Sequence, residues 1–154
     1  VPMGGDLKPA AAGKVPTFLV AALKDPQGAN LDRIQIVKGW LDASGKAQEK
    51  VYDIVWAGSR KPDKDGKLPP VGDTVDVARA TVTNTIGAAE LAAVWKDPDF
   101  QPAQRAFYYA RVIEIPTPRW TAYDQVRFGV KMSDDVPMKQ QERAWTSPIW
   151  YSPI

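Results

Sequence analysis

The sequence predicts a mainly β protein: an antiparallel β-sandwich, immunoglobulin-like in style, with long loops and at most short helices. The 154 residues include 14 prolines and 11 glycines, which set frequent turns and leave little room for long helices. Apolar and β-branched residues gather in six or seven short runs between these turns, a spacing typical of sandwiches. Strands and helices do not alternate, which argues against a parallel sheet. A partly open barrel is the alternative architecture.

The run 105–116, RAFYYARVIEIP, is the strongest predicted strand. Aromatic and β-branched residues crowd it, and prolines bracket it. Read at period two, Phe107, Tyr109 and Arg111 share one face and Tyr108 lies on the other. Large apolar groups on both faces predict a strand in the middle of a sheet. Its expected partner is the run 144–151, where Pro148 lacks a ladder donor and indicates an edge or a bulge.

The N-terminal half contains three further predicted strands. The continuous apolar run 17–23, TFLVAAL, predicts a buried strand ended by the turn DPQG at 25–28. The runs 31–40 and 48–56 alternate apolar and polar residues and flank the turn sequence at 43–46, so they predict a hairpin.

The middle of the chain is less regular. Prolines, glycines and alternating charges make 58–72 a long loop. The Thr- and Val-rich stretch 74–83 predicts a strand with a bulge near 78–80, because its valines change face. The stretch 88–95 has helical propensity but is short, and we expect a short helix or turn leading into a strand. We expect 119–141 to be irregular, with one helical turn.

Composition limits the chemistry available. The chain lacks cysteine and histidine, which removes disulfides, thiolate nucleophiles and the commonest general base and zinc ligand. The net charge is +2 without a basic run, so nucleic acid is not an expected partner. No apolar run approaches the roughly 18 residues of a membrane span. The length suits one domain: we expect a lead-in arm or linker at 1–15 and a single β-sandwich domain at 16–154.

Two short patterns are candidate metal sites. Gly4 and Gly5 place Asp6 after two conformationally free residues, where backbone amides could approach an anion or the carboxylate could bind a metal. Asp63 and Asp65 open a sequence with the spacing of a calcium loop, but the later ligand positions of that loop are not filled. A flexible linker and a solvated loop turn are the simpler interpretations.

Carboxylates and aromatics supply the remaining candidates. An acid–base pair of the glycosidase type could come from five carboxylates, none of which lies in a motif: Asp97, Asp99, Asp134, Asp135 and Glu142. Six tryptophans are many for this length. Most flank predicted strands, where an indole closes a core. Trp120 and Tyr123 lie in the irregular region and are the best candidates for an exposed binding or interface surface.

Long stretches of the chain carry a family likeness. They are VPMGGDL at 1–7, DPQGANLDRIQIVKGW at 25–40, EKVYDIVWAG at 49–58, KLPPVGDTVDVA at 67–78, AELAAVWKDPDFQPAQRAFYYARVIEIPTPRW at 89–120 and QERAWTSPIWY at 141–151. In these stretches the chain resembles the C-terminal portion of the bacterial domain-of-unknown-function family 3604 (DUF3604). Members of that family resemble, in their N-terminal part, the polymerase-and-histidinol-phosphatase (PHP) type of metal-dependent hydrolase.

The resemblance implies a role beside a catalytic domain. Histidines and aspartates of the missing N-terminal domain would hold divalent metal ions for hydrolysis of a phosphoester or related bond. This chain would be a non-catalytic accessory domain packed on that domain, with no catalytic, metal-binding or cofactor-binding residue of its own. Gly4, Gly5 and Asp6 would lie near the interface, and export to the periplasm or secretion is the location that the family suggests.

Two other functions stay open from the residues alone. Exposed tryptophans could make the chain a carbohydrate- or polymer-binding module. Paired carboxylates could make it a hydrolase in its own right.

Overall fold

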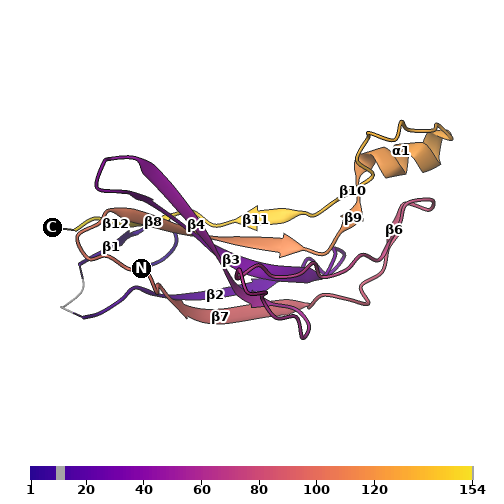
Figure 1. Ribbon diagram of the computed structural model, residues 1–154. Helices are drawn as coiled ribbons and strands as arrows, with labels where there is room; N and C mark the ends of the chain where they lie inside the picture. Colours follow the sequence, from indigo (N-terminus) through magenta and orange to yellow (C-terminus); the bar gives the residue numbers. More distant parts are fainter. Residues whose placement is uncertain (10–12, 154) are drawn as a thin grey trace.

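The structure, a computed structural model, describes residues 1–9 and 13–153. Two β layers lie face to face (Figure 1): a six-stranded sheet and a two-stranded ribbon. The strands of the large sheet run in the order β1-β12-β8-β3-β4, and β11 also pairs with β8. Their bounds are β1 Asp6–Leu7, β3 Leu31–Leu41, β4 Ala47–Trp56, β8 Ala106–Glu114, β11 Arg143–Trp145 and β12 Ile149–Tyr151. The prediction of a mainly β, antiparallel, sandwich-like fold is confirmed.

Strand β8 lies at the centre of the large sheet, as its sequence predicts. One neighbour is β3, and the other side is shared by β11 and β12. The predicted partner run 144–151 is therefore confirmed, and it is interrupted at 146–148, where Pro148 cannot donate to a ladder. Side chains alternate as expected: Tyr108 faces the ribbon and is 1% exposed, while Phe107 stacks on Tyr109 on the other face.

The predicted hairpin is β3–β4. Asp42 closes its turn, because the Asp42 carboxylate accepts hydrogen bonds from the Ser44 hydroxyl and from the backbone amides of Ser44 and Lys46. Hydrogen bonds lower the pKa of Asp42 to about 2, the one from the Ser44 hydroxyl foremost and then the one from the Gln48 side-chain amide. The side chain therefore helps to fix the register of β3–β4, which with β3–β8 is one of the two longest antiparallel pairs among the described residues.

The ribbon consists of β2 (Thr17–Leu23) and β7 (Glu90–Lys96), paired antiparallel along their whole length. Of the two alternatives expected for 88–95, the turn leading into a strand is confirmed and the short helix is wrong, because pairing with β2 satisfies the backbone of a segment too short to be stable as a helix alone. The ribbon turns Phe18 and Leu91 inward against Ile36 and Tyr108. This contact between the layers forms the hydrophobic core.

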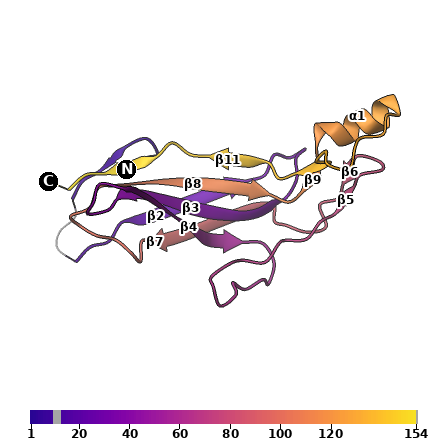
Figure 2. The ribbon, with the colours of Figure 1, turned by 45° about the horizontal axis from the view of Figure 1, so that its top comes forward.

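The far end of the molecule carries the helix and two small ribbons (Figures 1 and 2). They are α1 (Trp120–Phe128), β5 (Val75–Asp76) paired with β6 (Thr81–Val82), and β9 (Thr117–Pro118) paired with β10 (Lys139–Gln140). The single bulged strand predicted at 74–83 is wrong. The chain instead turns back through Ala80, whose φ is +51°, so that Val75 meets Val82.

The irregular region at 119–141 is more helical than expected, because α1 has nine residues. Gly129 adopts φ +63° and ends the helix, as glycine commonly does after a last turn. Among the residues that the structure describes, none belongs to a helix of sufficient length and apolar character to cross a membrane.

The N-terminal arm is tied to the sheet. β1 pairs in parallel with β12, and the Gly4 amide donates to the Pro148 carbonyl. Residues 10–12 of the predicted lead-in arm lie outside the described part of the chain.

Candidate interaction surfaces

A buried ion pair lies between the two layers. The Lys38 ammonium donates to the Asp97 carboxylate over 2.6 Å and to the Asp99 carbonyl over 2.8 Å, and the Tyr108 hydroxyl donates to Asp97 over 2.7 Å. The side chains of Lys38 and Asp97 are 2% and 0% exposed. Burial, and then the bond to Asp97, raise the pKa of Tyr108 above its ordinary value. These buried bonds hold the turn between β7 and β8, which contains Asp97 and Asp99, against Lys38 of the large sheet.

The same turn carries an exposed counterpart of this pair. The Asp99 carboxylate accepts from Lys50 at 2.5 Å and from the Tyr52 hydroxyl at 2.7 Å. The bond from Lys50 is the main cause of the lowered pKa of Asp99. Asp97 and Asp99, the nearest to a predicted acid–base pair, are thus both bound to lysines.

A second buried carboxylate anchors the 58–72 loop. Asp32 is fully buried, and Arg60 and Arg33 donate to its two oxygens over 2.6 and 3.0 Å. Arg60 also donates to the Pro69 carbonyl. Sequence reasoning missed both buried pairs. The sequence did contain one indication of them: Asp32 and Lys38 are charged residues within the more apolar strand of the hairpin, where a charge is buried and needs a partner.

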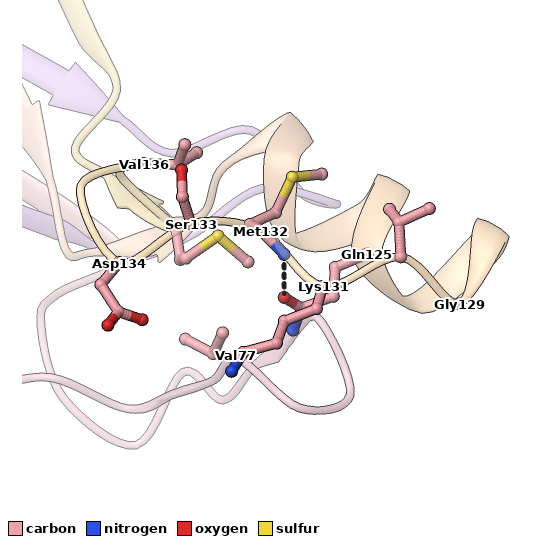
Figure 3. A pocket seen from close by; sticks show the side chains of 10 residues that line it. Val77, Gln125, Gly129, Lys131, Met132, Ser133, Asp134 and Val136 are labelled. Carbon is pink, nitrogen blue, oxygen red and sulfur yellow. Dashed lines mark hydrogen bonds between the residues drawn. The ribbon is translucent and has the colours of Figure 1, made fainter.

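A shallow cavity of about 600 Å³ lies at the helical end of the molecule (Figure 3). Its walls come from α1, the segment after it and the β5–β6 turn. Gln125 reaches across to accept the Met132 amide, and Asp134 and Lys131 lie at its edge. The described residues contain no group of three or more metal-ligating side chains, here or elsewhere. Lys131 and Asp134 therefore give the edge of the cavity one positive and one negative charge.

The predicted interface aromatics lie on the same distal helix. Trp120 is 59% exposed and Tyr123 is 52% exposed, and Phe128 adds a third exposed ring at 64%. The other candidates lie at the opposite end: the Gly5 carbonyl accepts the Trp150 amide, and Asp6 is part of β1. The structure does not bring the two groups of candidates together.

The candidate calcium aspartates form a turn. Asp63 accepts the backbone amides of Asp65 and Lys67 at 2.9 and 2.8 Å. The Asp63 carboxylate therefore stabilises the turn by binding backbone amides, a common role of aspartate in turns.

The outer face of the β2–β7 ribbon is an exposed apolar surface. Leu19 and Leu23 are each 78% exposed, and Val94, directly opposite Leu19, is 66% exposed. Ala21 and Ala92 form the next pair and are also exposed. The prediction that the β2 run is buried on both faces is therefore wrong for this face.

Strand β2 is also an edge. The bonds Lys24 N–H to Ala89 O and Asp97 N–H to Pro16 O show that the even-numbered residues of β2 are those that bond to β7. The odd-numbered residues of β2 therefore direct their N–H and C=O groups to the other side. Among the described residues no second strand pairs with this edge of β2, and a long apolar edge is a surface that natural proteins normally cover.

The family model for proteins of unknown function DUF3604 matches residues 1–153. The chain belongs to the DUF3604 family. This confirms the family likeness of the sequence. No curated protein and no solved structure matches the chain.

Proposed function

We propose that this DUF3604 chain is a non-catalytic accessory β-domain that packs on a PHP-like, metal-dependent hydrolase domain of the same protein. Metal ions and hydrolysis would belong to that other domain, whose histidines and aspartates would bind them. The β-domain would stabilise it and form one wall of its substrate cleft. The family resemblance supplies the class of partner.

The outer face of the ribbon carries this proposal. A continuous apolar strand such as β2 is typical of a strand covered on both faces, yet Leu19 and Leu23 are 78% exposed. Full burial of such a side chain stabilises by roughly 1.5–3 kcal/mol. Burial of Leu19, Leu23 and Val94 by another domain would therefore contribute favourably to the free energy of association between the two domains.

The experiment uses the full protein with Leu19→Glu and Val94→Glu together. Glutamates at these two opposite positions would place carboxylates in the interface without a partner. We expect limited proteolysis between the two domains to become at least tenfold faster. Circular dichroism of the chain by itself should stay unchanged, because both side chains are exposed there.

Phe128→Glu is the matched control, because Phe128 is 64% exposed on the distal helix and away from the ribbon. It should change the cleavage rate less than twofold. Equal cleavage of the wild type and the double variant would refute packing through the ribbon.

A further inference from the structure

The face of the large sheet that points away from the ribbon carries a row of side chains along β8. Arg105 precedes the strand, and Phe107, Tyr109 and Arg111 follow at every second position. Alternate residues of a strand point to one face about 6.6 Å apart, so the row is roughly 20 Å long. The rings of Phe107 and Tyr109 are nearly parallel, at 8°, with centroids 6.4 Å apart.

Two exposed tryptophans flank this row. Trp150 lies opposite Phe107 in the β12–β8 register, and its ring centroid is 5.4 Å from that of Phe107. Trp145 lies opposite Arg111 in the β11–β8 register. They are 47% and 60% exposed, and their strands, β12 and β11, lie beside β8 (Figure 1). The result is an open aromatic strip with an arginine at each end.

A cavity of about 540 Å³ begins at one end of the strip. Phe107, Trp150, Arg105 and Glu49 contribute to its lining, together with Gly39. A Cβ on Gly39 would lie 2.3 Å from the Phe107 ring. The absence of that Cβ lets the ring lie close against the sheet and leaves a flat aromatic wall.

The charges of the strip are unbalanced. Arg143 lies two residues before Trp145 on β11 and thus on the same face. Among the described residues Arg105, Arg111 and Arg143 have no carboxylate within ion-pair distance, whereas Asp53 is already bound by Arg33. Arg111 uses only its Nε, which donates to Gln35, in the hydrogen bonds found within the described structure. Its terminal nitrogens and the other two guanidinium groups therefore favour an anionic ligand.

We propose that this strip binds an acidic oligosaccharide, of the uronate type. The C–H faces of the sugar rings would pack on Phe107, Tyr109 and the two tryptophans, which provide flat apolar area. Ring carboxylates would accept paired hydrogen bonds from Arg105 and Arg111, since a guanidinium matches a carboxylate in shape. Glu49 would accept hydrogen bonds from sugar hydroxyls.

A single-stranded nucleic acid could also stack on aromatic side chains. Glu49 in the lining would repel its phosphates, and the whole chain carries a net charge of only +2. The acidic sugar fits this combination better, because it presents hydroxyl groups to Glu49.

The test is calorimetric titration of the chain with a pentamer of galacturonic acid, with cellopentaose as the neutral probe and a thymidine decanucleotide as the nucleic-acid probe. We expect binding of the acidic pentamer to be at least fivefold tighter than that of the neutral one, and to weaken as salt is raised. No binding of the acidic pentamer, or binding of the decanucleotide as tight as that of the pentamer, would overturn the proposal.

Matched variants locate the site. Trp145→Ala and Arg105→Gln should each weaken binding at least fivefold. Trp120→Ala removes a tryptophan of nearly equal exposure, 59% against 60%, from the distal helix and should leave the affinity unchanged. Equal effects of the two tryptophan variants would also overturn the proposal.

The sugar strip and the ribbon surface lie on opposite sides of the sandwich. Leu19→Glu with Val94→Glu should therefore leave sugar affinity unchanged. Failure of one proposal leaves the other standing.

Discussion

Replacement of Lys38 by Met is expected to destabilise the protein strongly. Methionine keeps most of the volume of the side chain but removes the ammonium that lies 2.6 Å from the Asp97 carboxylate. Asp97 is fully buried, and among the described residues it would keep only the Tyr108 hydroxyl and the Asp99 amide as hydrogen-bond donors. Its negative charge would thus be left without a compensating cation.

The size of the effect follows from the burial. Removal of one partner of a buried ion pair typically costs about 3–5 kcal/mol. In a domain of this size about 1 kcal/mol shifts the melting temperature by roughly 2–4 °C. Lys38→Met should therefore lower the melting temperature by roughly 6–20 °C. Urea and thermal unfolding followed by circular dichroism measure both quantities.

Lys50→Met is the matched control. Lys50 lies directly opposite Lys38 in the β3–β4 register and pairs with Asp99 on the same turn, but its side chain is 50% exposed. An exposed pair contributes at most about 1 kcal/mol. A loss of less than about 1 kcal/mol for Lys38→Met, or equal losses for the two variants, would refute the assignment of Lys38–Asp97 as a buried tie between turn and sheet.

Three further outcomes are expected. Gly39→Ala should destabilise by about 1–3 kcal/mol in urea unfolding, because the new methyl group meets the Phe107 ring, and the loss should largely disappear in a Phe107→Ala background. Burial foremost, and then Glu142, raise the pKa of Glu114, so the folded state binds a proton there more tightly than the unfolded chain and the ionised carboxylate lowers stability at pH 7. Glu114→Gln should therefore raise the melting temperature at pH 7. A gain that persists well below pH 4.5, the ordinary pKa, would contradict this cause. Asp42→Ala should speed amide exchange at 44–46, where the Asp42 carboxylate accepts two amides; unchanged exchange would show that the turn forms without it.

The regular strands could be predicted because their residues carry the pattern locally. The run at 105–116 has aromatic and β-branched residues between prolines, and 31–56 contains its own turn residues. In contrast, AAELAAVW at 88–95 has helical composition, and only the partner β2, nearly seventy residues away in the chain, makes it a strand. Tertiary pairing overrides local propensity in such segments.

The site residues were less accessible to sequence reasoning. The exposure of Trp120 and Tyr123 was expected, because their surroundings lack an apolar pattern. The exposure of one face of β2 was not expected, because a continuous apolar run predicts burial on both faces and does not show that one face lacks a covering layer. Likewise, Arg105, Trp145 and Trp150 come from separate segments, and only the register of three strands places them in one strip.

The most direct measurement is amide hydrogen exchange of 17–23, compared between this chain alone and the full protein. If the catalytic domain covers the ribbon, the amides of Thr17, Leu19, Ala21 and Leu23 should exchange rapidly in the isolated chain. They should slow by at least tenfold in the full protein, while exchange in α1 stays the same. Identical exchange of β2 in both proteins would contradict the account.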